Sequence, residues 1–252
     1  MFNPKYTFKS LVLDLSESNV GAPHAIALAV AKAPGRGYNP LVIYGADGLG
    51  KTHLLHAIGQ HISCHKKSAR VAYLSAYKFA CEQAEAIANK RLVAFREKYM
   101  QKDVLLIDNF QFLVGNERFQ EEVFRFFHTL KESRKQIVLA SDRPLNKISG
   151  LETSLISFIE GGVVVELQPD SRIRTAVLQN AAQYMNVAFP EDVTNFLVRN
   201  FKNLRRLKGA AVRMAARACL DGKTLNLKLV KSELKEMLIE ERRSFVSVGI
   251  NL

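Results

Sequence analysis

Residues 45–52 read Gly45-Ala-Asp-Gly-Leu-Gly-Lys-Thr52 and fit the pattern G-x-x-x-x-G-K-[S/T] at every fixed position. An apolar run, LVIY at 41–44, precedes them, and residues 52–62 follow with helical spacing. A glycine-rich turn between a strand and a helix lets backbone N–H groups curl around a phosphate, and the helix N-terminus adds positive potential. A chance glycine-rich turn would not bring both flanking elements. The motif therefore predicts a nucleotide site formed by Gly45, Ala46, Asp47, Gly48, Leu49, Gly50, Lys51, Thr52 and His53.

Three further side chains are expected to serve this site. Lys51 should reach the β- and γ-phosphates of ATP, and the Thr52 hydroxyl should ligate Mg²⁺. Asp108 ends the apolar run VLLID at 104–108, where a carboxylate can hold the same ion through water. An apolar run followed by Asp is weak evidence alone, but the phosphate loop upstream strengthens it. Asp142, in Ser141-Asp142 after a later apolar run, either lies on the γ-phosphate side or caps a helix.

Strand and helix patterns alternate through the first two thirds of the chain. Beside 41–44, strands are predicted at 71–74, 104–107, 137–140 and 162–167, and helical patterns at 76–100 and 119–131. Strands that are apolar throughout predict an α/β fold with a parallel sheet covered on both faces. Only helices are predicted later, at 171–184, 190–200, 204–219 and 229–241. We expect a nucleotide-binding domain over 1–169, a small all-helical domain over 170–243 and a short tail over 244–252.

Composition restricts the class of protein. The net charge of +12 and the sequence pI near 9.7 favour a nucleic-acid partner, although a basic surface without a particular partner remains open. No apolar run could span a bilayer, and the polar N-terminus lacks a signal peptide, so a cytoplasmic protein is expected. The three scattered cysteines have no metal-ligand spacing.

A series of short motifs occurs in fixed order: NPKYTF at 3–8, YNPL at 38–41, GLGKTHLL at 48–55, LLID at 105–108 with QF at 111–112, SDR at 141–143 and LRRLKGA at 204–210. In order and spacing they resemble the AAA+ ATPase core of DnaA, the family of bacterial replication initiators. The resemblance covers residues 3–238. It implies ATP or ADP with Mg²⁺ as ligands, and protomers that assemble on origin DNA and stretch its single strands.

The resemblance also implies roles for individual residues. Residues 76–100 match the family's extra helix that contacts single-stranded DNA, although a solvated helix face is an equal alternative. Arg213 matches the second sensor of the family's helical lid, which touches the γ-phosphate, and a guanidinium can fork onto its oxygens. Asp142 would be the first sensor. The basic residues of the DNA-contacting segment are Lys78, Lys90, Arg91, Arg96 and Lys98.

Three departures from the family pattern bear on activity. Asn109 replaces a second acid; an amide can orient water but cannot act as a base, so hydrolysis should be slow or absent. Ser154–Ile159 lacks both arginines of the matching family stretch, and Phe158 stands at the arginine finger, which leaves self-assembly in doubt. No helix-turn-helix domain follows, so the sequence is either a fragment or a paralogue without that domain.

Three functions remain open from the sequence. The leading hypothesis is an ATP-binding initiator-like protein of chromosome replication, acting alone, as a homo-oligomer or together with a full-length initiator. The second is a regulatory adaptor of such an initiator, with no DNA role of its own. The third is a helicase-loader-type ATPase, which shares the phosphate loop but not the NPKYTF opening.

Overall fold

A parallel five-stranded sheet forms the centre of the first unit. The computed structural model describes residues 2–11, 22–115, 117–168, 171–221 and 224–246. Its strands are β1 (Leu41–Tyr44), β2 (Val71–Ser75), β3 (Val104–Asp108), β4 (Gln136–Ser141) and β5 (Val163–Glu166), arranged in the order β2-β3-β4-β1-β5. This confirms the predicted α/β class with a parallel sheet. Because β4 lies between β1 and β3, the loops that follow these three strands emerge at one edge of the sheet.

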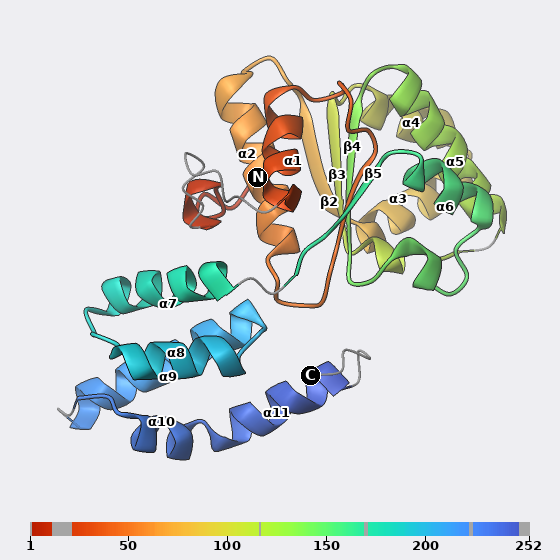
Figure 1. Cartoon of the computed structure of the whole chain (residues 1–252). Coiled ribbons are helices and arrows are strands. Elements are labelled where there is room, and N and C mark those ends of the chain that lie inside the picture. Colours follow the sequence, from red (N-terminus) through yellow and green to blue (C-terminus); the bar gives the residue numbers. More distant parts are fainter. Residues whose placement is uncertain (1, 12–21, 116, 169–170, 222–223, 247–252) are drawn as a thin grey trace. The chain divides into compact units, whose positions relative to one another are not determined.

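Helices cover both faces of this sheet (Figure 1). One face carries α1 and α2, and the other carries α3 to α6. The bounds in this unit are η1 Lys9–Leu11, α1 Ala22–Lys32, α2 Lys51–His65, α3 Ala76–Ala88, α4 Leu92–Met100, η2 Phe110–Phe112, α5 Glu117–Glu132, η3 Leu145–Lys147 and α6 Thr153–Glu160. Neither α1 nor α6 was predicted from the sequence.

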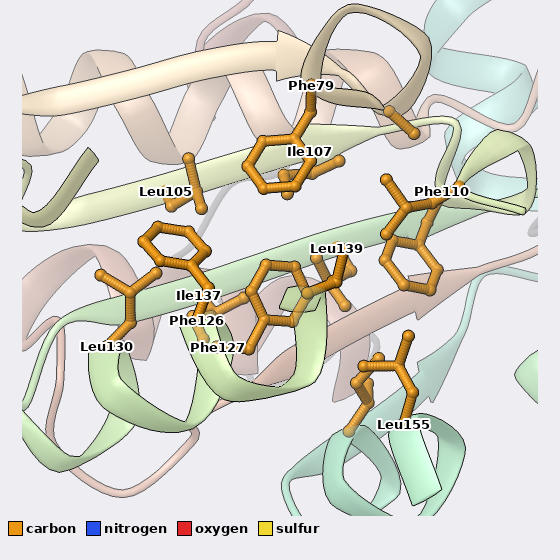
Figure 2. Packing of buried hydrophobic residues seen from close by; sticks show 14 of the residues in the cluster. Phe79, Leu105, Ile107, Phe110, Phe126, Phe127, Leu130, Ile137, Leu139 and Leu155 are labelled. Carbon is orange, nitrogen blue, oxygen red and sulfur yellow. The ribbon is translucent and has the colours of Figure 1, made fainter. Parts of the chain in front are cut away.

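The face of the sheet under α3 to α6 is packed with aromatic side chains. Figure 2 shows Phe79 of α3 and the neighbouring Phe126 and Phe127 of α5 enclosing Leu105 and Ile137 of the strands. Ring centroids of Phe79 lie 6.0 Å from Phe126 and 6.2 Å from Phe127. Apolar burial of this extent fixes β3 between its neighbours and so holds its carboxyl end, where the site begins.

The segment 76–100 is two helices and not one. Helix α3 ends at Ala88, Lys90 adopts a left-handed conformation (φ 56°), and α4 starts at Leu92. At the end of α3 the Asn89 side-chain Nδ2 donates a 3.0 Å hydrogen bond to the Glu85 carbonyl. Phe79 and Ala86 are in helical register, but Phe95 is nine residues beyond Ala86, on the opposite side of a continuous helix, so both residues reach the same core only because the chain turns between them.

Only helices occur in the described part of the second unit, which comprises Asp47–Leu49 and Gln168–Leu252. They are α7 Ser171–Met185, α8 Glu191–Asn200, α9 Leu204–Asp221, α10 Leu227–Glu233 and α11 Lys235–Val246. The helix predicted over 229–241 is therefore wrong as a single element. Leu234, between α10 and α11, has non-helical dihedrals and a fully buried side chain that joins the unit's own core.

Two predicted domain boundaries fall at or near residues that the structure does not describe. Residues 169–170, the expected domain boundary, lie outside the described residues, as do 247–252 of the expected tail. Residues 244–246 belong to α11. None of the helices described has the length and apolar character needed to cross a membrane.

Candidate nucleotide-binding site

The loop between β1 and α2 depends on glycine where the backbone is restricted. Gly50 precedes α2 with φ 97°, a region that side-chain-bearing residues rarely adopt. At Gly45 a Cβ atom would lie 2.5 Å from the Leu167 carbonyl oxygen, so no other residue fits there without displacing the backbone directly after β5. The predicted strand, turn and helix are therefore present, with α2 starting at Lys51.

Lys51 directs its ammonium group back into the loop. Its Nζ donates hydrogen bonds of 2.6 Å to the Gly45 carbonyl and 3.0 Å to the Ala46 carbonyl, and only 6% of the residue is exposed. A buried ammonium held by neutral carbonyls gains more from an anion, because charge-assisted hydrogen bonds are roughly twice as strong. A phosphate in the loop would offer oxygens to this group in place of the carbonyls.

The tip of the loop, Asp47–Leu49, belongs to the helical unit. Within that unit Asn203 Nδ2 donates 2.6 Å to the Asp47 carbonyl, and the Leu204 N–H donates 3.0 Å to the Gly48 carbonyl. Leu49 is buried, whereas Asp47 is exposed.

Thr52 and Asp108 meet across the α2–β3 interface. Thr52 Oγ1 donates a 2.7 Å hydrogen bond to Asp108 Oδ2, and the Asn109 N–H donates 2.9 Å to Oδ1. Asp108 is 2% exposed at the end of β3. A hydroxyl beside a carboxylate is the kind of oxygen donor pair that Mg²⁺ takes together with phosphate oxygens and water. The arrangement can therefore hold a divalent cation next to the phosphate loop.

Two aromatic side chains that the sequence did not single out complete the surroundings of Asp108. The Tyr73 hydroxyl, on β2, donates 3.0 Å to Asp108 Oδ2. Burial, together with the neighbouring Asp108 carboxylate, raises the pKa of Tyr73, so this group stays a protonated donor. The His56 ring packs against Tyr73 at a tilt, with centroids 4.3 Å apart, and its Nδ1 accepts from the Asn3 N–H. Burial lowers the pKa of His56, against the opposing charge of Asp108.

His53, predicted as part of the site, is held by the N-terminal segment. Its ring stacks on Tyr6 at 4.6 Å, and Nε2 lies 3.1 Å from both the Thr7 carbonyl and the Ser10 hydroxyl. The NPKYTF motif thus packs on α2 at the residue next to Thr52. No repeat or charge pattern in the sequence could have revealed this contact, because the segment and α2 are far apart in the chain.

Asp142 follows β4 at the same edge of the sheet as Asp108. Arg143 forks onto it, with Nε 2.7 Å from Oδ1 and Nη2 2.8 Å from Oδ2. The Asp142 N–H donates 3.3 Å to Oε1 of Gln111, a residue of η2 directly beyond β3. The helix-cap alternative for Asp142 is wrong, because the next helical turn, η3, is preceded by Pro144.

Arg213, predicted as a γ-phosphate sensor, lies on α9 in the helical unit. Its Nη2 is 3.9 Å from Oε2 of Glu233, and Arg217 approaches the other oxygen of the same carboxylate at 3.5 Å. The Arg213 side chain is 50% exposed. An exposed ion pair of this kind contributes little to stability and exchanges partners readily.

The five basic residues predicted to contact nucleic acid differ in their surroundings. Lys78 and Lys98 both approach Glu82, at 4.0 and 2.6 Å. Burial alone would raise the pKa of Glu82, but hydrogen bonds from Lys98 and Tyr99 and the nearby ammonium charges lower it. Arg96 pairs with Glu122 of α5. Lys90 and Arg91, in contrast, are exposed at the turn between α3 and α4.

Phe158 lies on α6, turned toward α5. Its ring centroid is 5.5 Å from Phe124 and 5.8 Å from His128, and Lys131 Nζ lies 5.2 Å from the ring. The position at which the resemblance implies an arginine finger is therefore used for packing between two helices.

Known proteins share this fold and this phosphate loop. A family model described as the bacterial DnaA ATPase domain matches residues 2–166. Domain III of DnaA from Thermotoga maritima is 39% identical, with a TM-score of 0.80 over 94% of this chain and 99% of that one. A DnaA bound to AMPPCP and single-stranded DNA is 32% identical, with a TM-score of 0.77 over 99% of this chain and 73% of that one.

Two more solved structures extend the comparison. AMPPCP-bound DnaA from Aquifex aeolicus is 34% identical, with a TM-score of 0.76 over 94% of this chain and 70% of that one. Thermotoga maritima RuvB, at 18% identity and a TM-score of 0.66 over 91% and 71% of the two chains, shares the fold alone.

Proposed function

The chain belongs to the bacterial DnaA ATPase family of AAA+ proteins, and from this premise we propose that it binds ATP with Mg²⁺ and acts in the initiation of bacterial chromosome replication or in its control. The observation that carries the proposal is the 2.7 Å contact between Thr52 Oγ1 and Asp108 Oδ2 beside the buried Lys51. It joins the two parts that P-loop ATPases use to hold Mg²⁺·ATP. Such a protein would act in the cytoplasm.

The chain's own residues suit a nucleotide that is held and not rapidly consumed. Lys51 would bind the β- and γ-phosphates, and Thr52 and Asp108 would hold Mg²⁺, which neutralises phosphate charge when bound. Asn109 is in a left-handed conformation with its N–H on Asp108. Its amide can orient water but cannot take the proton of the attacking water, so hydrolysis is slow. The bound nucleotide, ATP or ADP, would then serve mainly as a conformational ligand.

Asp142 and Arg213 are the residues proposed to report the γ-phosphate. Arg143 holds Asp142 with both oxygens engaged, which fixes the orientation of the carboxylate. Arg213 would exchange the 3.9 Å contact with Glu233 for phosphate oxygens when ATP is present. The exchange is favoured because a phosphate carries more charge than one carboxylate and accepts a forked guanidinium.

Single-stranded DNA is the proposed nucleic-acid partner, as it is for the similar DnaA solved with AMPPCP. The surroundings of the basic residues single out Lys90 and Arg91. Lys78 and Lys98 share the charge of Glu82, and Arg96 shares that of Glu122. A cation already paired gains less on meeting a phosphate, so the exposed turn should supply most of the affinity.

The test measures binding of a fluorescently labelled oligothymidylate by anisotropy, with ATP, with ADP and without nucleotide. The double variant Lys90→Ala/Arg91→Ala should bind at least about 10-fold more weakly, and its log–log salt slope should fall by about 1.4, or about 0.7 per phosphate contact. Lys66→Ala/Lys67→Ala removes two consecutive exposed lysines beyond α2 and is the matched control. If both double variants lose the same affinity for the oligonucleotide, binding depends on overall positive charge and not on the turn between α3 and α4.

A regulatory adaptor is the second candidate, in a form that does not act through an arginine finger of its own. With no arginine at this position, the chain cannot supply an arginine finger from α6 to a second copy of itself. It could still present bound ATP to the finger of a full-length initiator in a hetero-oligomer. ATP-dependent pairing with an initiator in gel filtration, with no DNA binding in the anisotropy assay, would favour this function over the first.

A further inference from the structure

We infer that Tyr73 is a positioning residue for the metal-binding carboxylate: its hydroxyl holds Asp108 in the orientation that binds Mg²⁺ with nucleotide. The inference rests on the proposed function of Mg²⁺·ATP binding. Tyr73 itself contacts neither nucleotide nor metal and acts through Asp108. Neither the phosphate-loop pattern nor the VLLID run includes this residue, which comes from a different strand.

The geometry at Asp108 gives its two oxygens different partners. Oδ1 accepts a hydrogen bond from the backbone N–H of the next residue, Asn109, at 2.9 Å. Oδ2 accepts two, from Thr52 Oγ1 at 2.7 Å and from the Tyr73 hydroxyl at 3.0 Å. Thr52 must also offer its oxygen to the cation, so its position changes with the state of the site. The Tyr73 hydroxyl has no such second task. It is therefore the constant side-chain donor that fixes the torsion of the carboxylate.

The body of Tyr73 is held independently of Asp108. Its backbone pairs with Leu106 in the parallel β2–β3 ladder, and the ring packs beside His56, with Phe2 6.3 Å away. His56 in turn accepts the Asn3 N–H. Because β2, His56 and the N-terminal segment hold Tyr73 in place, its hydroxyl can orient the Asp108 carboxylate without shifting its own position. This preorganisation is what a positioning residue needs.

A purely structural role is the alternative, since a half-buried phenol must find some acceptor. The two roles differ in what they predict for the metal. A structural hydroxyl affects folding stability and lowers nucleotide affinity equally with and without Mg²⁺. A positioning hydroxyl affects only the part of the affinity that Mg²⁺ adds. Outer partners of metal ligands change metal affinity by about 10- to 100-fold when removed.

The experiment compares wild type with Tyr73→Phe, which removes the hydroxyl and keeps the ring. Affinity for ATP is measured by equilibrium dialysis in Mg²⁺ and in EDTA, and affinity for Mn²⁺ in the presence of ADP by electron paramagnetic resonance. Tyr99→Phe is the matched control, because Tyr99 is also a tyrosine whose hydroxyl donates, at 2.7 Å, to a carboxylate, that of Glu82 on α3, and its side chain is buried. Thermal unfolding of both variants checks that the fold is kept.

We expect Tyr73→Phe to lower the Mg²⁺-dependent gain in ATP affinity and the Mn²⁺ affinity by about 10-fold, with affinity in EDTA within about twofold of wild type. Tyr99→Phe should change neither. An unchanged gain in Tyr73→Phe, or parallel losses in Mg²⁺ and in EDTA, would overturn the inference while leaving the proposed function intact. If wild type binds no ATP in either buffer, the proposed function itself fails.

Discussion

Thr52 Oγ1 donates a 2.7 Å hydrogen bond to Oδ2 of Asp108, 56 residues further along the chain. Thr52 stands in the first turn of α2, and Asp108 is the last residue of β3, which is separated from β1 by β4. Two motifs that the sequence offers independently are thereby brought to one edge of the sheet. Their meeting places a hydroxyl and a carboxylate beside the phosphate loop, the pair of oxygen donors proposed above to hold Mg²⁺.

Lys51→Ala should abolish the stabilisation of the protein by ATP. ATP at about 100 times its Kd stabilises a folded protein by about 2.7 kcal/mol, which is a rise of roughly 5–10 °C in melting temperature for a chain of this size. Without the Lys51 ammonium, the phosphates lose their buried cation. Thermal unfolding with and without Mg²⁺·ATP measures the rise, and Lys67→Ala, beyond the other end of α2, should keep it. A full rise in Lys51→Ala would refute the phosphate-loop assignment.

The sequence predicts those parts of the site that depend on local spacing. The loop and its lysine are fixed by a contiguous motif, and the buried strand of Asp108 by its apolar run. Strand positions follow within one or two residues because each strand is apolar throughout. Sheet order is a tertiary property, and it decides that β2 neighbours β3. Tyr73 could therefore not be assigned to Asp108 from spacing alone.

The same limit explains the errors in the helical segments. The apolar residues of 76–100 leave helical register between Ala86 and Phe95, but that shift alone does not fix where the backbone turns, which is at Lys90. The partner of Lys98 was equally hidden. Lys98 meets Glu82, 16 residues earlier, only because α4 folds back beside α3. Counting charges treats Lys78, Lys98 and Arg91 alike. In the structure both lysines approach Glu82, whereas Arg91 is exposed.

Asn109→Asp should raise the rate of ATP hydrolysis in a single turnover of pre-bound ATP. A positioned general base contributes about 10²–10⁴-fold, and a carboxylate restored without an arginine finger should regain at least about 10-fold of it. Asp is tolerated in the left-handed conformation that Asn109 adopts. Asn186→Asp makes the same exchange at another left-handed residue, on the helical unit, and should leave the rate unchanged. Prompt hydrolysis by wild type would show that another group positions the water.

Stability should fall as the pH is lowered below about 6.5, partly because of His61. Burial, helped by the nearby His65 and Lys32, lowers the pKa of His61 below its ordinary value of 6.5. The unfolded chain therefore takes up a proton on this residue at a higher pH than the folded chain, so the unfolded state gains as pH falls. The loss of stability levels off once the pH falls below the pKa of His61 in the folded state.

Urea unfolding at a series of pH values from 7.5 to 5 measures this loss, and His61→Gln should reduce its slope without removing it. Part of the slope must remain because burial also lowers the pKa of His56. Identical slopes in the variant and wild type would mean that His61 is protonated equally in the folded and unfolded states.

Phe158→Arg should destabilise the first unit and not simply restore an arginine finger. The ring contacts Phe124, His128 and the Lys131 ammonium, so an arginine loses aromatic packing and adds a cation beside an existing one. We expect a loss of about 1–3 kcal/mol in the free energy of unfolding, measured in urea. Ser157→Arg places the same side chain at the exposed neighbouring position and should cost less than about 0.5 kcal/mol. If the two variants are equally stable, the aromatic contacts of Phe158 contribute nothing to the free energy of unfolding.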